Sequence, residues 1–370
     1  MKIGIITQPL HTNYGGLLQN YALQKVLKKL GHNPITLDQG YPNPLWRVLA
    51  SYIKTLILKS IGKGENRKYP SLCTNEKHKL YIRQHTDYFI NKYITHTIPF
   101  LYAKDFRNYT INSQLDALIV GSDQVWRPIY NPDVLRSFFD FAKGVKIKKL
   151  AYAASFGVDF WEFNSKQSRG ILKLIRDFKA VSVREKSGVD LCKSYLHVDA
   201  THVLDPTMLL DKEDYISLVM NENEPLSKGD LFTYILDDSE VKRQYIDEIA
   251  SELNLVPFTS MAQDADSICP PVTQWLRSFM DAKFVVCDSF HGAVFSIIFN
   301  KPFMIIGNKE RGMTRFNSLL ETFKLKNRMV DNLKDVHTII NTPIDWDKIN
   351  QIRTGLKIIS IDFLNNNLNK

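Results

Sequence analysis

The feature that most constrains the fold is an alternation of short apolar, β-branched runs with longer stretches of helical periodicity. Residues 2–7 form such a run, and residues 15–30 form the helical stretch that follows it. Gly31 ends that stretch, at the position where helices take a left-handed cap. Alternation of this kind predicts parallel strands joined by helical crossovers, which is the arrangement of α/β folds.

The alternation falls into two series, separated by the turn-forming residues Asp205, Pro206 and Thr207. The strands of the first series are expected at 2–7, 34–37, 117–120, 149–153 and 180–183, and those of the second at 230–236, 256–259, 283–286 and 302–306. We therefore expect two Rossmann-like domains, residues 1–207 and 208–370, that face each other across a cleft. Such a cleft is the default place for a ligand. The closing helical stretch, 346–368, is expected to pack back on one of the two domains.

The positive charge of the chain is concentrated at one end. The net charge is +9, but residues 1–110 hold 16 Lys and Arg against 5 Asp and Glu, while the remainder holds 32 against 34. No nucleic-acid-binding motif accompanies this basic third, so no nucleic acid is expected as a partner. An anionic membrane surface or an anionic substrate would also be attracted to it.

Residues 45–57 support the interpretation that the chain binds a membrane surface, because their helical wheel has one apolar face and one polar face. The apolar face holds Leu45, Trp46, Val48, Leu49, Tyr52, Ile53, Leu56 and Ile57. This pattern is typical of an interfacial membrane anchor, and equally of a helix packed on its own domain, which we favour. The chain has no apolar run long enough to span a bilayer and no signal-peptide pattern. We expect it to be cytoplasmic, and possible peripheral binding at the inner face of the membrane stays open.

The cysteines give no sign of a metal centre. Cys73, Cys192, Cys269 and Cys287 lack CxxC spacing, and the proximity of Cys192 to His197 and His202 fits no common ligand pattern. We expect neither a metal nor a disulfide framework.

His291 carries the strongest local signal. It lies in Asp288-Ser289-Phe290-His291, where a buried strand ends and a helix begins, and the carboxyl end of a parallel strand faces the ligand crevice. A histidine there is a candidate general acid or base. A histidine that caps the helix or fills a core position would give the same pattern.

Cationic residues follow two other predicted strands. Lys309, Arg311 and Arg315 follow strand 302–306, and Arg184 follows strand 180–183. Arginine suits bidentate contact with carboxylate or phosphate. The 306–316 loop alone is better explained as an ordinary solvated loop, and Arg184 could equally pair with a nearby carboxylate.

Two polar segments of the first domain also follow strands. The first segment is a glycine turn formed by Asn13, Tyr14, Gly15 and Gly16. Because it lacks both GxGxxG and a Walker lysine, it is weak evidence for nucleotide binding. Its glycines would still allow close backbone approach to a polar ligand. The second segment holds Asp123, Gln124 and Trp126, which suit a sugar. Its ordinary alternative is a helix cap, with Trp126 in the core.

Five segments in order resemble the polysaccharide pyruvyl transferase family. They are TNYGGLLQNYAL, VGSDQVWRP, VSVREKSG, LDPTMLL and DSFHGAVFSIIFNKPF, and the resemblance runs from about residue 3 to about residue 320. It implies a GT-B-like pair of domains and transfer of a pyruvyl group from phosphoenolpyruvate to sugar hydroxyls, with formation of a ketal and release of phosphate. The implied acceptor is a surface polysaccharide or its lipid-linked precursor, and no cofactor is implied beyond phosphoenolpyruvate as the donor.

The resemblance also implies roles for individual residues. His291 would be the general acid, and Arg184 and Arg311 would contact the donor, with Lys309 and Arg315 as neighbours. Some family members have arginine two residues before the histidine, where this chain has Ser289, and Arg315 is the candidate replacement. Asp123 and Asp288 are the candidates for the base that accepts the acceptor's proton. Asp123 is preferred because it lies in the other domain.

Two further hypotheses stay open. A GT-B-type glycosyltransferase using a nucleotide sugar would need a carboxylate for the ribose hydroxyls, and no persuasive candidate is found near the second domain's side of the cleft. A non-catalytic, membrane-associated binding protein is favoured by the basic helix, but the polar residues at several strand ends count against it.

Overall fold

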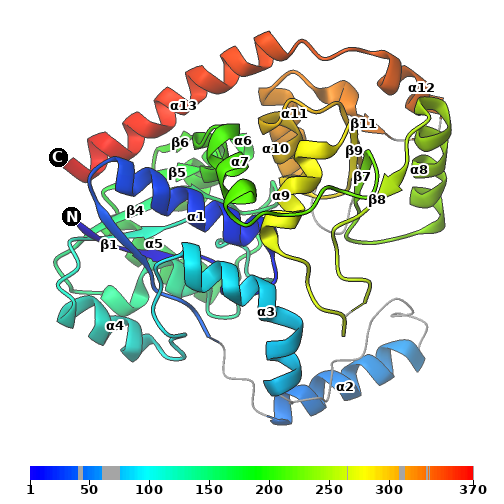
Figure 1. Cartoon of the computed structure of the whole chain (residues 1–370). Coiled ribbons are helices and arrows are strands. Elements are labelled where there is room, and N and C mark those ends of the chain that lie inside the picture. The colour runs from blue at the N-terminus through cyan, green and yellow to red at the C-terminus, as the bar shows by residue number, and fades with distance from the viewer. Residues whose placement is uncertain are drawn as a thin grey trace.

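The computed structural model describes residues 1–40, 45–60, 76–264, 266–307, 313–330, 332 and 334–369, with only the backbone of 45–48, 50, 51 and 76. Two lobes, each built on a parallel sheet, lie beside each other (Figure 1). The first sheet ends at His202 and the second begins at Leu231. The domain boundary that we propose, at residue 207, falls between them.

The first sheet has the strand order β2-β1-β3-β4-β5-β6. Its strands are β1 Lys2–Ile6, β2 Asn33–Thr36, β3 Ala117–Val120, β4 Lys148–Ala154, β5 Ala180–Val183 and β6 Ala200–His202. All five pairings are parallel, and β3 is buried along its whole length, as expected for a strand covered on both faces. The order reverses direction between β1 and β3, which makes their carboxyl ends a topological switch point.

The second sheet has the order β11-β10-β9-β7-β8 and is also entirely parallel. Its strands are β7 Leu231–Tyr234, β8 Pro257–Phe258, β9 Phe284–Cys287, β10 Phe303–Ile306 and β11 Met329–Val330. The order reverses between β7 and β9, so this lobe has a switch point of its own.

Helices connect the strands and cover the sheets. They are α1 Tyr14–Lys29, α2 Leu45–Ser60, α3 Glu76–Tyr93, α4 Ala103–Asn112, α5 Ser165–Leu174, α6 Lys186–Leu191, α7 Lys212–Asn221, α8 Glu240–Leu253, α9 Val272–Asp281, α10 Phe290–Ile298, α11 Thr314–Thr322, α12 Lys334–Asn341 and α13 Trp346–Asn369. No helix in the described ranges combines the length and the apolar character needed to cross a bilayer.

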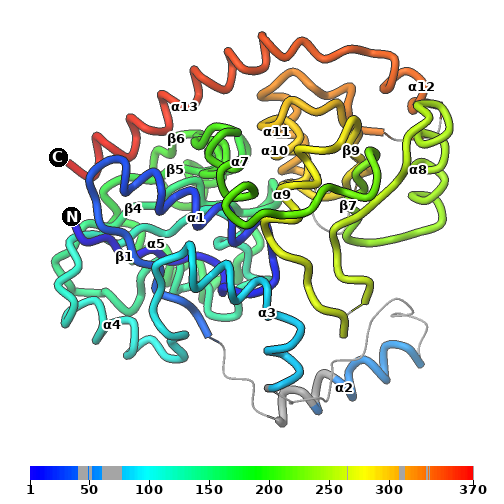
Figure 2. The backbone as a smooth tube through the Cα atoms, in the orientation of Figure 1, coloured from blue at the N-terminus to red at the C-terminus, as the bar shows by residue number. Residues whose placement is uncertain are grey.

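The lobes share one apolar core that runs from the first sheet through α1, α7 and α9 to the second. Tyr14 bridges them, because its hydroxyl donates to the Pro270 carbonyl at 2.8 Å and its ring lies 5.8 Å from that of Trp275. The last helix, α13, follows the second lobe but runs back across the first (Figure 2). There the Ser360 hydroxyl accepts a hydrogen bond from the Leu204 amide at 3.0 Å. These contacts hold the two switch points facing each other.

Helix α2 differs from the packed helix that we favoured. Leu49, Ile53, Leu56 and Ile57 of its apolar face are about half-exposed to solvent, whereas Thr55 is fully buried. The side chains of Leu45, Trp46 and Val48 lie outside the described residues. In Figure 1 the helix lies below both sheets and apart from them.

Candidate active site

The two switch points meet at a cleft of about 300 Å³. The first lobe contributes Thr12, Asn13, Gly15, Asp123 and Gln124, and the second contributes Tyr234, Leu236, Asp288, Ser289, Phe290, His291 and Arg315. Each of these residues lies in β7 or follows β1, β3, β7, β9 or β10 along the chain. The cleft therefore lies where open parallel sheets bind their ligands.

Three helices begin at this cleft. Asn13 caps α1 by accepting from the Gly16 amide at 3.2 Å, and Ser289 stands at the cap position of α10 without a side-chain hydrogen bond to that helix. Arg315 is the second residue of α11. Helix N-termini carry partial positive charge and free amide donors, so the arrangement favours an anion in the cleft.

His291 lies in the first turn of α10, and its side chain packs against the first turn of α1. A methyl group added to Gly15 would lie 2.0 Å from the His291 Nδ1 atom and 2.3 Å from Cγ, closer than any side chain could approach. A glycine is therefore required at position 15 for this histidine of one lobe to reach the other. The imidazole is 6% exposed and lines the cleft, so it is buried yet accessible to a ligand.

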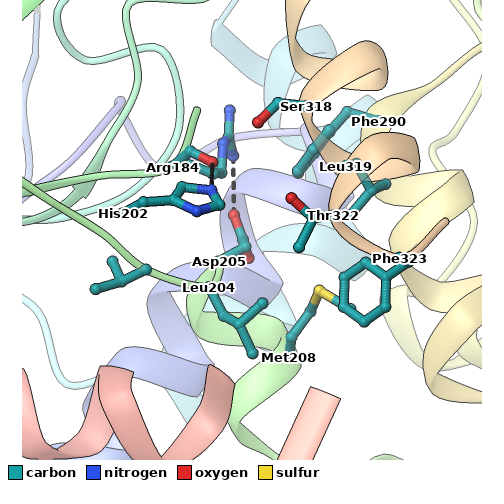
Figure 3. Close-up of a pocket in the computed structure, with 11 residues that line it drawn as sticks. Arg184, His202, Leu204, Asp205, Met208, Phe290, Ser318, Leu319, Thr322 and Phe323 are labelled. Carbon is teal, nitrogen blue, oxygen red and sulfur yellow. Dashed lines mark hydrogen bonds and ion pairs between the residues drawn. The ribbon is translucent and has the colours of Figure 1, made fainter. Parts of the chain in front are cut away.

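A carboxylate stands behind the imidazole. The Oδ2 atom of Asp205 lies 3.7 Å from His291 Nε2, longer than a direct hydrogen bond, and also accepts from Arg184 Nη1 at 2.8 Å and from the Ser122 hydroxyl at 2.8 Å. Its other oxygen accepts from the amide and hydroxyl of Thr207. Figure 3 shows Arg184 and Asp205 lining a neighbouring cavity of about 20 Å³, room for about one water molecule.

The partners of Asp205 keep it ionised. Burial by itself would raise the pKa of this carboxyl, but the His291 imidazole, the Arg184 guanidinium and the Thr207 hydroxyl together lower it far below its ordinary value. An ionised carboxylate therefore lies on one side of the imidazole, and the N-terminus of α10 lies on the other.

Two arginines converge on the ring of Phe290. The guanidinium carbon of Arg184 lies 4.3 Å from the centre of that ring, and that of Arg315 lies 5.7 Å from it. Burial, together with the positive charge of Arg184, lowers the pKa of Arg315 to about 10, which leaves it charged at neutral pH. Burial also disfavours the charge of Arg184, but Glu185 and Asp205 outweigh it and raise the pKa. A bound anion would relieve the repulsion between the two cations.

Arg184 and Arg315 differ in their access to the cleft. Arg315 lines it directly, whereas Arg184 lines the small cavity of Figure 3 and not the cleft. Among the described residues, no atom accepts a hydrogen bond from Arg184 Nη2, although the side chain is almost completely buried. Arg184 thus supplies positive charge and pairs with Asp205, and within the described part of the chain Arg315 is the arginine that lines the cleft.

Asp123 is the carboxylate on the first lobe's side of the cleft. Its φ of 75° lies in the left-handed region, which is unfavourable for a residue with a side chain. Hydrogen bonds from the Val125 and Ser155 amides to its carbonyl, at 2.7 and 3.1 Å, hold it there. Its carboxylate accepts from the Gln124 amide at 2.8 Å and from the Asn13 side chain at 3.4 Å. Strained backbone at a cleft is typical of functional residues.

Asp288, the other candidate base, is already committed to its own lobe. Its carboxylate is fully buried, accepts from the Leu236 and Asp237 amides at 2.7 and 3.2 Å, and pairs with Lys242 at 2.6 Å. These contacts anchor the loop after β7. The geometry therefore favours Asp123 over Asp288 as a proton acceptor.

Three of the remaining expected site residues lie away from the ligand space. Trp126 is fully buried, with its ring 4.9 Å from that of Phe138 and stacked on it, so the expected contact with a sugar is wrong and the core alternative holds. Tyr14 serves as the bridge between lobes described above, and Gly16 belongs to the α1 cap. Lys309 and Arg311 lie outside the described residues.

Asp205 is the functional residue that the sequence did not single out. It was interpreted as part of a turn between domains, although LDPTMLL is one of the segments that carry the family resemblance. That shared segment was the available signal. Phe290, whose ring both arginines approach, is likewise absent from the residues predicted from the sequence.

Comparison with solved structures identifies known proteins that have a similar fold. UDP-GlcNAc 2-epimerase from Neisseria meningitidis, bound to UDP-GlcNAc, matches with a TM-score of 0.54 and 9% identity over 98% of this chain and 100% of that one. S. aureus MnaA with UDP matches at 0.52 and 10% identity over 95% and 90%. The Methanocaldococcus jannaschii UDP-GlcNAc 2-epimerase matches at 0.51 and 12% identity over 98% and 100%. At these identities the likeness shows a shared GT-B-like fold and no more.

Sequence comparison places the family. No curated protein matches the chain in sequence. The family described as polysaccharide pyruvyl transferase matches residues 13–310, which include strands β3 and β9 and all of the cleft residues except Thr12 and Arg315. The chain therefore belongs to the polysaccharide pyruvyl transferase family.

Proposed function

We propose that this protein transfers a pyruvyl group from phosphoenolpyruvate to two hydroxyls of a sugar in a polysaccharide or its precursor, forming a cyclic ketal and releasing phosphate. Family membership implies a transferase with a polysaccharide acceptor. The observation that carries the finer proposal is the combination of three helix N-termini, Arg315 and a carboxylate-backed histidine around one cleft.

The donor suits the charge of this cleft. Phosphoenolpyruvate carries a carboxylate and a phosphate on one small carbon frame. Arg315 would bind one of these groups directly, and the amides at the start of α10 would bind the other. Arg184, which does not line the cleft, adds positive potential without contacting the donor.

His291 would act as the general acid. Its proton goes to the methylene carbon of phosphoenolpyruvate, which becomes a methyl group, and the positive charge that develops on the central carbon is attacked by a sugar hydroxyl. Asp205, kept ionised by its partners, stabilises the imidazolium before transfer. The attacking hydroxyl gives its proton to Asp123, on the opposite lobe.

Loss of phosphate then completes the transfer. The bond between the central carbon and the phosphate oxygen breaks, a second hydroxyl of the same sugar attacks that carbon, and the proton of this hydroxyl leaves with the phosphate. Arg315 stabilises the negative charge that develops on the leaving group. One pyruvyl ketal and one hydrogen phosphate result, and both side chains are restored when the one proton that Asp123 has taken up returns to His291 by exchange with solvent.

The test is incubation with phosphoenolpyruvate and a panel of saccharides, with phosphate release and the mass gained by the acceptor as paired readouts. His291→Ala should abolish both and leave phosphoenolpyruvate binding, measured by calorimetry, largely intact. Wild-type turnover by this variant would refute the role of His291. Transfer from a nucleotide sugar in place of phosphoenolpyruvate would refute the proposed reaction.

A further inference from the structure

Helix α2 presents a stripe of large apolar side chains to solvent. The α2 stripe consists of Leu49, Ile53, Leu56 and Ile57, which are 54%, 56%, 47% and 55% exposed. Spacings of four, three and one residue place them on one face of the helix. In Figure 1 the helix stands apart from both sheets, so neither sheet covers this face.

The rest of α2 shows that the helix is turned the opposite way from an ordinary surface helix. Thr55 is fully buried, and Lys59, one turn further along the same side, is half-buried. The side of the helix that holds Thr55 is therefore turned towards the protein, and the side that holds the α2 stripe is turned away from it. A helix that only had to pack on its own domain would bury the stripe and expose Thr55. Contiguous exposed apolar side chains of this kind mark an interaction surface.

The charge of α2 indicates which kind of partner would bind to the α2 stripe. The helix contains Arg47, Lys54 and Lys59 and no acidic residue, and Lys54 is exposed next to the stripe. It lies in the part of the chain, residues 1–110, that holds 16 basic and 5 acidic residues. A second copy placed stripe to stripe would bring like charges together, whereas an anionic lipid surface would neutralise them.

The helix that follows α2 in the chain connects it to the cleft. In α3, Arg83 donates to the Leu10 carbonyl at 3.2 Å, in the loop that continues to Thr12 and Asn13 of the cleft. The Ile82 carbonyl accepts from the Cys269 amide at 2.9 Å, directly before the Pro270 that Tyr14 contacts. Helix α3 is thus anchored to loops of both lobes near the candidate active-site cleft.

We propose that the α2 stripe and its flanking lysine bind an anionic lipid surface, with the apolar side chains inserted among the lipids. This is the geometry of an interfacial helix, with apolar area and positive charge acting together. If the proposed function holds, the surface would place the cleft beside a lipid-linked acceptor. The binding itself does not depend on the reaction.

The experiment measures binding of the full chain to vesicles by co-sedimentation. Phosphatidylcholine vesicles that contain roughly a third phosphatidylglycerol should bind the wild type at low salt, and raising the salt or omitting phosphatidylglycerol should weaken binding several-fold. The double variant Ile53→Asn/Ile57→Asn should bind at least ~10-fold more weakly. Because both side chains are half-exposed, its circular dichroism and melting temperature should match the wild type.

The matched control is Ile358→Asn/Ile359→Asn. These isoleucines of α13 are 58% and 48% exposed, so the same residue change is made on another helix, and vesicle binding should stay at the wild-type level. Absence of binding at low salt, or equal loss in both double variants, would overturn the proposal. A wild-type dimer that the α2 variant converts to a monomer, with no vesicle binding, would identify a second copy as the occupant. Phosphoenolpyruvate binding by the α2 variant, measured without vesicles, separates this outcome from failure of the proposed function.

Discussion

The close contact between Gly15 and His291 allows the position of the imidazole to be tested by adding a single methyl group. In the substitution Gly15→Ala, the new methyl carbon would lie 2.0 Å from His291 Nδ1, 2.3 Å from Cγ and 2.7 Å from Cε1. Non-bonded carbon contacts need about 3.5 Å, so the imidazole has to move by about 1 Å or more. The added methyl group acts on the imidazole ring of the other lobe and removes no charged group from the cleft.

The expected effect is larger on catalysis than on stability. A displacement of about 1 Å at a reacting group costs about 10²-fold in rate. Overpacking costs about 1–3 kcal/mol, and alanine regains up to about 1 kcal/mol over glycine in a helix. The melting temperature should therefore fall by only a few degrees, while kcat/KM falls about 100-fold.

The assay is the initial rate of phosphate release from phosphoenolpyruvate with the best acceptor of a saccharide panel. Gly355→Ala in α13 is the matched control, because a methyl group there has no atom within 4 Å and should leave the rate unchanged. A folded Gly15→Ala protein with wild-type turnover would show that the position of His291 against α1 is not needed for the reaction.

Three further changes test other parts of the site. Asp205→Asn should lower kcat about 10²-fold or more with little change in the KM for phosphoenolpyruvate, because the amide cannot stabilise the imidazolium; a change confined to KM would contradict this. Arg315→Gln should weaken phosphoenolpyruvate binding by about 10- to 100-fold, the value of one charge-assisted hydrogen bond, and unchanged calorimetric affinity would refute its role. The third test is acid stability: the pKa of Asp205 is lowered in the folded protein, so its carboxylate stabilises the fold above about pH 4 and this contribution is lost as pH falls below that value. The wild type should therefore lose thermal stability more steeply than Asp205→Asn between about pH 4 and pH 2, and parallel curves from scanning calorimetry would contradict it.

Periodicity was sufficient to predict the fold class and the central elements. The bounds of strand β3 and helix α8 agree with the sequence pattern, since both lie between clear turn signals. The short edge strands β6 and β11 were not predicted, because two or three partly buried residues give no measurable alternation. Strand order, and with it the two switch points, depends on contacts between distant segments that no local pattern records.

Residues of the candidate site could be predicted where a polar or charged residue comes soon after a predicted strand. His291, Arg315 and Asp123 were found in this way, and the structure brings them to one cleft. Asp205 was not found, because its partner His291 belongs to the other lobe and the local sequence is that of a turn. Trp126 was misassigned for the reverse reason: an aromatic residue after a strand has the same local pattern whether it faces a sugar or the core.

The amphipathic pattern of α2 shows the same limit. A helical wheel separates the apolar face from the polar face but does not say which of them meets the protein. The burial of Thr55 and the exposure of Ile53 decide this, and both depend on the three-dimensional packing of the helix.

We expect the cleft to bind a small donor that carries two anionic groups, and to bind no nucleotide sugar. Calorimetric titration of the wild-type protein with phosphoenolpyruvate, and separately with UDP-GlcNAc, tests it most directly. We expect one molecule of phosphoenolpyruvate to bind per chain, with displacement by inorganic phosphate, and no binding heat from UDP-GlcNAc. Saturable binding of UDP-GlcNAc together with no binding of phosphoenolpyruvate would contradict the account.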